Sequence, residues 1–228
     1  MSPDEAAPPL PLLLREACAF ASMRVKATFA SAVPTGIIGD GRDVIVIPGF
    51  LASDRTTARL RKSLNLAGYR AHTWGLGRNY GVKERTLALL DARFEQMQLT
   101  GPVTIIGWSL GGLIAREYAK FAPHRVATVI TLGSPFSGNP RANNAWRLYE
   151  LVAGHSVDAP PIDTVLSEKP PVPTVAFWSR RDGVIAPASA RGSDGDVDDQ
   201  IELSCSHMAF VTEPDAIRAI IAVLSRAS

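Results

Sequence analysis

The sequence predicts an α/β fold, a mostly parallel, doubly wound sheet with helices on both faces. Apolar runs of strand length alternate along the chain with longer segments whose apolar residues recur at helical spacing. The first strand-like run is continuously apolar after Asp43, over 44–47, which is typical of a strand buried on both faces of a parallel sheet. The 228 residues suffice for one such domain, and we expect its crossover connections to be right-handed.

The first half of the chain supplies three strands and two helices. Turn-rich residues 35–42 precede the first strand, Gly68 stands where the first of these helices should stop, and Gly101-Pro102 breaks the chain before the third strand. We expect strands at 43–47, 69–74 and 103–106 and helices at 56–66 and 82–97.

The second half continues the alternation after a helix at 110–121, which Pro123 stops. The predicted strands are 126–132, 174–179 and 200–203, and an amphipathic helix at 214–227 closes the fold.

Residues 139–172 interrupt this alternation and form a small cap insertion. A short helix over 145–152 would show Trp146 and Tyr149 on one face, and a proline-rich passage follows it. Insertions of this length in a regular fold are more often functional than decorative. We expect Trp146 and Tyr149, together with Pro135 and Trp108, to line a pocket for an apolar group.

The N-terminal region, residues 1–34, is predicted to be a loose tail followed by an amphipathic helix over 10–32. We interpret the helix as packed on the edge of the domain formed by 35–228. The alternative is an interfacial helix that contacts a lipid surface or a second subunit, as in a homodimer.

Bulk composition excludes several classes of protein. The net charge of +2 and the lack of a long basic run argue against nucleic-acid binding. The two cysteines, Cys18 and Cys205, provide neither a disulfide framework nor a metal cluster, and we interpret them as reduced core thiols. Because no apolar stretch reaches the roughly 18 residues that span a bilayer, and the first residues do not resemble a signal peptide, we expect a cytoplasmic protein.

The motif with the clearest chemistry is Gly107-Trp108-Ser109-Leu110-Gly111, a G-x-S-x-G pattern between a predicted buried strand and a predicted helix. In that context the turn strains the serine backbone and lifts its hydroxyl clear of the sheet. The glycines allow strand and helix to approach closely. The pattern therefore predicts that Ser109 is a nucleophile, the alternative being an ordinary glycine-rich connection.

A serine nucleophile needs a base, and the base needs an orienting acid. Of the four histidines, only His207 directly follows a predicted strand end; we interpret His72, His124 and His155 as structural, solvent-facing or loop residues. Asp182 follows the strand at 174–179 and lies between serine and histidine in the chain order expected of such sites. Other acids are less well placed, because Asp158 and Asp163 lie in the insertion and the aspartates of 194–199 form a loop that we expect to be solvated.

Acyl transfer also needs N–H donors for the developing oxyanion. We expect the backbone N–H of Leu110, directly after the serine, and that of Phe50, in the loop that follows the first parallel strand.

Four segments together resemble α/β-hydrolases of the bacterial lipase and esterase type: 47–50, 107–112, 131–135, and the pair Asp182-Gly183 with Ser206-His207. The resemblance covers residues 43–226 and implies the α/β-hydrolase fold. By position it implies Ser109, Asp182 and His207 as catalytic triad and Phe50 and Leu110 as oxyanion donors. Many lipases have histidine at the positions of Pro48 and Trp108, so the resemblance favours an esterase for smaller acyl substrates, or for acyl substrates that the sequence does not identify, over a triglyceride lipase.

The predicted function is hydrolysis of carboxylic esters through an acyl-enzyme, with no metal or other cofactor, because the base already activates the serine. The expected partner is a small-molecule ester with an apolar acyl part. The same residues are compatible with a thioesterase or an acyltransferase, and the fold alone is compatible with a binding protein without catalytic activity.

Overall fold

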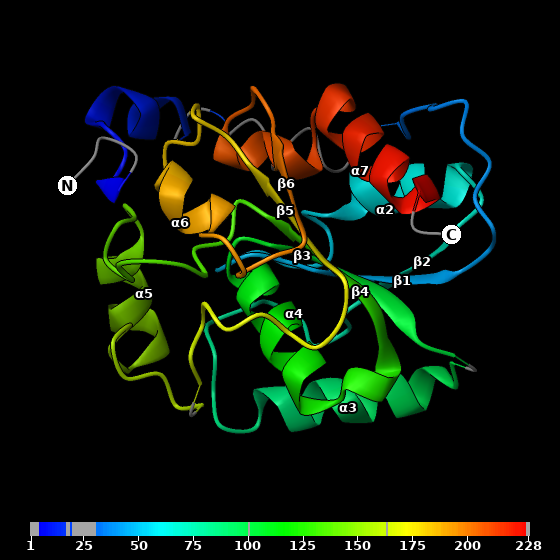
Figure 1. Ribbon diagram of the computed structural model, residues 1–228, viewed down its shortest axis with the longest axis horizontal. Helices are drawn as coiled ribbons and strands as arrows, with labels where there is room; N and C mark the ends of the chain where they lie inside the picture. The colour runs from blue at the N-terminus through cyan, green and yellow to red at the C-terminus, as the bar shows by residue number, and fades with distance from the viewer. Residues whose placement is uncertain (1–4, 17–18, 20–30, 100, 163, 227–228) are drawn as a thin grey trace.

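Six strands form one fully parallel sheet in the order β2-β1-β3-β4-β5-β6 in a computed structural model (Figure 1). The structure describes residues 5–16, 19, 31–99, 101–162 and 164–226. The strands are β1 (Asp43–Ile47), β2 (Arg70–Thr73), β3 (Val103–Trp108), β4 (Val126–Leu132), β5 (Thr174–Trp178) and β6 (Asp199–Glu202). The predicted α/β class and parallel sheet are confirmed.

Helices cover both faces of the sheet (Figure 1). The helices α2 (Ala58–Leu66) and α7 (Pro214–Arg226) lie on one face, and α3 (Thr86–Met97) and α4 (Leu110–Phe121) lie on the other. Side chains of successive strand residues point to opposite faces of the sheet, so both faces are apolar. In β1, Val44 and Val46 pack in the core beneath α2 and α7, and Ile45 and Ile47 pack in the core beneath α3 and α4. The central strand β3 is buried at every residue, β1, β4 and β5 are buried at all but one residue each, and the edge strands β2 and β6 are only partly covered.

Most elements match the sequence prediction to within about two residues at each end, and two α-helices differ more. The helix expected from residue 82 begins at Thr86, since residues 78–83 form a loop. A short helix, α6 (Pro187–Arg191), was not predicted, because five residues are too few to show a periodic pattern. The insertion contains the expected short helix as α5 (Trp146–Ala153), and 3-10 turns occupy Pro123–Arg125 and His207–Val211.

The N-terminal helix is described only in part. Residues 10–16 are helical and lie against the loop that follows β5, with the Leu12 carbonyl next to Gly183. Most of the remainder of the predicted helix, residues 17–18 and 20–30, lies outside the described residues. Within the described ranges, every helix is too short or too polar to cross a membrane.

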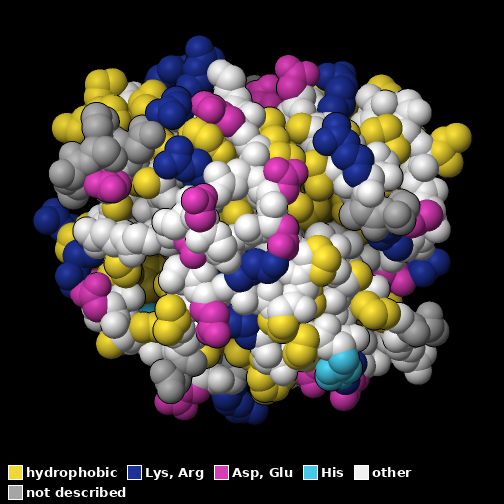
Figure 2. Space-filling view, viewed as in Figure 1, with side chains coloured by type: hydrophobic (Ala, Val, Ile, Leu, Met, Phe, Trp, Pro, Cys, Tyr) yellow, Lys and Arg dark blue, Asp and Glu magenta, His cyan; other side chains and the backbone are white. Residues whose placement is uncertain are grey.

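The carboxyl ends of the parallel strands meet at one edge of the sheet, where parallel α/β sheets usually bind ligands. This edge collects the loops at 48–53, 133–138, 179–186 and 203–206 and the turn at Ser109. On the face shown in Figure 2, basic and acidic side chains are interspersed, in keeping with a net charge of only +2.

Candidate active site

Ser109 occupies a strained turn between β3 and α4. Its backbone angles are φ 55° and ψ −123°, a region that side-chain-bearing residues rarely adopt. A Cβ on Gly107 would overlap the backbone of Gly111 and Gly112, and a Cβ on Gly111 would overlap the carbonyl of Ile47. Strand and helix therefore pack this closely only because those positions are glycine.

The loop after β1 lies directly against this turn. A Cβ on Gly49 would be 3.1 Å from the Ser109 Cβ, so the loop backbone passes beside the serine. In the described part of the chain, the backbone N–H groups of Phe50 and Leu110 donate to no protein acceptor. Both residues line the cavity that Ser109 faces. The two N–H groups predicted for an oxyanion are thus available to a ligand.

Asp182 and His207 come from successive strand ends and form a buried pair. The His207 Nδ1–H donates to Asp182 Oδ2 at 2.7 Å, and each residue is only 2% exposed. The other carboxylate oxygen, Oδ1, accepts the N–H groups of Val184 at 2.7 Å and Ile185 at 2.8 Å. These bonds fix the carboxylate, which in turn fixes the imidazole and its tautomer.

The surroundings of His207 favour its charged form. Burial lowers the pKa of His207, but the charge and hydrogen bond of Asp182 and the charge of Glu16 together raise it above its ordinary value. The Trp108 ring lies 5.6 Å from the imidazole between centroids, and its Nε1–H donates to the His207 carbonyl at 3.1 Å. Ser109 follows Trp108 in the chain, and His207 contacts the Trp108 ring, so the two residues are close. In this structure Ser109 makes no hydrogen bond to His207.

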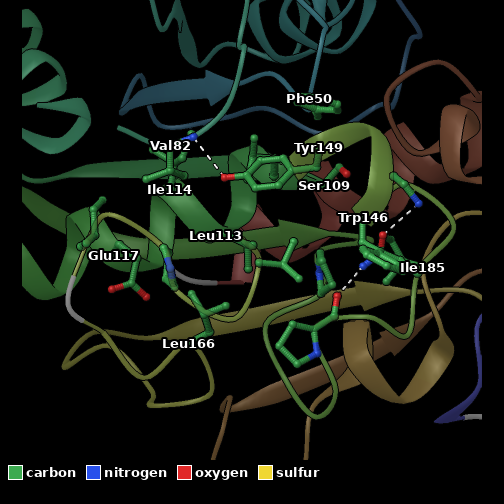
Figure 3. Close-up of a pocket in the computed structure, with 18 of the residues that line it drawn as sticks. Phe50, Val82, Ser109, Leu113, Ile114, Glu117, Trp146, Tyr149, Leu166 and Ile185 are labelled. Carbon is green, nitrogen blue, oxygen red and sulfur yellow. Dashed lines mark hydrogen bonds between the residues drawn. The ribbon is translucent and has the colours of Figure 1, made fainter. Parts of the chain in front are cut away.

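An apolar cavity of about 110 Å³ opens beside Ser109 and follows α4 (Figure 3). Ser109 lies at one end and Glu117 at the other, with Leu113 and Leu166 between them (Figure 3). The predicted pocket residues Pro135, Trp146 and Tyr149 line it. Trp108 does not, because its side chain is buried beside His207.

Sequence reasoning missed several lining residues. Leu113, Ile114 and Glu117 follow Ser109 at intervals that place them on one face of α4, and that spacing could have identified them. Leu166 and His155 come from the insertion, where no periodic signal exists. His155 is bonded within the cap, where its Nε2 lies 3.0 Å from the Val82 carbonyl and 3.3 Å from the Tyr149 hydroxyl.

Two further predictions concern residues outside the cavity. His72 pairs with Asp43 at 2.7 Å and His124 is exposed, as expected of residues without a role in the site. The acidic loop is largely exposed at Asp194, Asp198 and Asp199, as expected. Two of its carboxylates are also structural acceptors, because Asp196 accepts the Ser137 hydroxyl at 2.7 Å and Asp198 accepts the backbone N–H of Thr174 at 2.8 Å.

Cys205 is a free, half-buried thiol, and Cys18 lies outside the described residues. Burial, with the charges of Asp182, Glu16 and Glu213, raises the pKa of Cys205 to about 12. Over the residues that the structure describes, no three His, Cys, Asp or Glu side chains are grouped to hold a metal ion.

A family model for the alpha/beta hydrolase fold matches residues 40–159, just over half of the chain. The chain belongs to the alpha/beta hydrolase family. Solved alpha/beta structures agree on the fold. The naproxen esterase (carboxylesterase NP) of Bacillus subtilis has a TM-score of 0.58 and 13% identity, over 91% of this chain and 97% of its own. A structure of the metagenome-derived lipolytic enzymes LipS and LipT has a TM-score of 0.62 and 16% identity, over 86% of this chain and all of its own.

Curated relatives are more similar in sequence but match a shorter stretch. A pimeloyl-[acyl-carrier protein] methyl ester esterase of Aliivibrio salmonicida is 35% identical over 114 residues, 48% of this chain and 41% of that protein. The same enzyme of Photobacterium profundum is 34% identical over 116 residues, 48% of this chain and 42% of that protein. The alignments therefore span only about two fifths of the length of these relatives.

Proposed function

We propose that this alpha/beta hydrolase cleaves carboxylic esters of small acyl groups through a covalent acyl-enzyme on Ser109. The observation that carries the proposal is the backbone of Ser109, strained at φ 55° where α4 begins and facing an apolar cavity. Strain of this kind persists only where the surrounding structure enforces it, and it concentrates at functional sites. The ester hydrolases among the relatives support an ester as the bond that is cleaved.

The proposed reaction assigns one group to each step. His207 takes the proton of the Ser109 hydroxyl as its oxygen attacks the ester carbonyl, and Asp182 stabilises the resulting imidazolium. The N–H groups of Phe50 and Leu110 bind the oxyanion. The tetrahedral intermediate then releases the alcohol, which takes the proton from His207. Water, activated by the same histidine, attacks the acyl-enzyme and releases the acid and free Ser109.

The cavity supports a substrate with a small apolar acyl part. Its walls are apolar, formed by side chains such as Leu113, Ile114 and Leu166, so it suits a hydrocarbon acyl part. Its volume of about 110 Å³ lies well below the roughly 300–1,000 Å³ of pockets for drug-sized ligands. We therefore expect faster turnover of p-nitrophenyl butyrate than of p-nitrophenyl palmitate.

Active-site labelling tests the proposal. A fluorophosphonate should form one adduct, which peptide mass mapping should place on Ser109. Ser109→Ala should prevent labelling and lower kcat for p-nitrophenyl butyrate by at least about 10³-fold, because nucleophile and base act as a unit. Ser193→Ala, an exposed serine outside the site, is the matched control and should retain full activity. An adduct on another residue, or full activity of the Ser109→Ala protein, would refute the mechanism.

A further inference from the structure

Glu16 is a buried acid that the proposed reaction does not use. It is the last residue of the described helical segment 10–16, and it is only 2% exposed. A buried carboxylate is costly unless hydrogen bonds compensate for the lost water. Among the described residues no lysine or arginine forms an ion pair with Glu16.

The partners of Glu16 are backbone N–H groups of the two loops that carry the acid and the base. Its Oε1 accepts the N–H of Gly183 at 3.1 Å and the N–H of His207 at 2.5 Å. Its Oε2 accepts the N–H of Met208 at 3.1 Å. Gly183 directly follows Asp182 in the chain. The Glu16 carboxylate therefore binds the backbone next to Asp182 and the backbone of His207 itself. Hydrogen bonds to a charged acceptor are roughly twice as strong as neutral ones.

Gly183 is itself shaped by this contact. A Cβ at this position would overlap the Leu12 carbonyl and would lie 2.8 Å from the Glu16 Cγ. The loop after β5 therefore accommodates the N-terminal segment only with glycine here. On the far side, Ser179 joins the same two loops, because its hydroxyl donates to the Cys205 carbonyl at 2.6 Å. The loops are thus connected at three points: by Ser179, by the Asp182–His207 pair and by Glu16.

We propose that Glu16 is a positioning residue, which holds the loops of Asp182 and His207 in register so that the imidazole can serve Ser109. The inference rests on the proposed function. It assigns the N-terminal segment a part in the reaction, although that segment lies outside the sheet and its helices. An error of about 1 Å in the placement of such a group can lower a rate by roughly 10²-fold.

Glu16 also acts on His207 through its charge. The ionised groups that face the imidazole are Asp182, from the loop after β5, and Glu16, from the N-terminal segment, and both raise the pKa of His207. The other neighbours, the rings of Trp108 and Phe210, are uncharged. Nearby Cys205, with its pKa raised to about 12, is also neutral at neutral and acidic pH. Loss of the Glu16 charge should therefore lower the pKa of His207.

The test compares full-length Glu16→Gln with wild type in kcat, KM and the pH profile for p-nitrophenyl butyrate. His207 must be neutral to accept the serine proton, so activity falls as pH drops through its pKa. We expect kcat to fall about 10-fold or more, KM to stay within about 2-fold, and the acid limb to move to lower pH. Glu213→Gln makes the same charge change at an exposed position and should keep the wild-type profile.

A second variant separates charge from reach and covers the case in which Glu16→Gln does not fold. Glu16→Asp keeps the charge on a shorter side chain, so its acid limb should match that of wild type while kcat falls. Wild-type kcat in Glu16→Asp, or wild-type kcat and acid limb in Glu16→Gln, would overturn the inference and leave the proposed function intact. If the fluorophosphonate does not label wild-type Ser109, the proposed function itself fails.

Discussion

At the scale of single residues, Ser109 is both the proposed nucleophile and a residue whose backbone conformation is energetically unfavourable. Its φ of 55° is a conformation that glycine adopts freely and serine does not. Such a conformation costs about 1–3 kcal/mol, which the rest of the fold must supply. Because Gly107, Gly111 and Gly112 leave the chain no room to relax, the strain is built into the turn.

Replacement of Ser109 by glycine should release this strain. The relief is partly offset by the roughly 0.5–1 kcal/mol of extra chain entropy that glycine gives the unfolded state. We expect Ser109→Gly to exceed Ser109→Ala by about 1 kcal/mol in free energy of unfolding, measured by urea denaturation. The alanine variant is the matched control, since it lacks the hydroxyl but keeps the Cβ. A glycine variant less stable than the alanine variant would show that the turn is not strained.

At the scale of elements, the sequence predicts well those strands, turns and helices whose signal comes from residues close together in the chain. The continuous apolar run of β3, the turn at Ser109 and the periodicity of α4 are local features, and each lies where the pattern places it. Asp182 and His207 were also identifiable, because they follow predicted strand ends and parallel strands end at one edge.

The role of Glu16 was not predictable in this way. Its partners Gly183 and His207 lie 167 and 191 residues away, and they contribute backbone N–H groups that every residue except proline possesses. No residue type or spacing marks such a contact. The cavity-lining residues from the insertion, such as Leu166, were hidden for a related reason, because their segment has no regular structure to give them a period.

The helix α4 should set the length of acyl chain that fits. Leu113 is half-buried and projects into the cavity between Ser109 and Glu117 (Figure 3), so Leu113→Ala should deepen the acyl site. We expect the ratio of kcat/KM for p-nitrophenyl octanoate to that for the butyrate to rise about 10-fold, the low end of what a methylene contact contributes to specificity. Leu89→Ala, at a 48% exposed position on α3, should leave the ratio unchanged. An unchanged ratio in Leu113→Ala would mean that the acyl chain binds elsewhere.

At the scale of the whole molecule, buried charged side chains tie loops to the sheet and its helices. Glu16 accepts hydrogen bonds from backbone N–H groups that follow β5 and β6. Arg116, on α4, instead donates hydrogen bonds to backbone carbonyls. The Arg116 guanidinium donates at 3.1 Å to the carbonyls of Ser167 and Glu168, in the insertion, and of Asp196. Both side chains bind backbone groups that lack a partner within a strand or helix: Arg116 binds carbonyls of irregular segments, and Glu16 binds the N–H of Gly183 and the first two N–H groups of the 3-10 turn that begins at His207.

Arg116 is fully buried, and its guanidinium carbon lies 4.2 Å from the centre of the Phe136 ring. Burial lowers its pKa to about 10, so the group remains charged at neutral pH. Methionine replaces the aliphatic stem of arginine with an unbranched apolar side chain, but it is shorter and leaves three carbonyls without a donor. An unsatisfied buried polar group costs about 1–3 kcal/mol. We therefore expect Arg116→Met to lower the free energy of unfolding by about 3 kcal/mol.

In a thermal melt, a loss of that size should lower Tm by about 10 °C for a chain of this length. Arg85→Met, at an exposed arginine just before α3, is the matched control and should change Tm by no more than about 1 °C, since surface substitutions rarely matter. If Arg116→Met melts at the wild-type temperature, water or chain rearrangement satisfies the three carbonyls, and the insertion does not depend on Arg116 for its attachment. If it melts early yet binds the fluorophosphonate at the wild-type rate once folded, Arg116 anchors the cap without shaping the cavity beside Ser109.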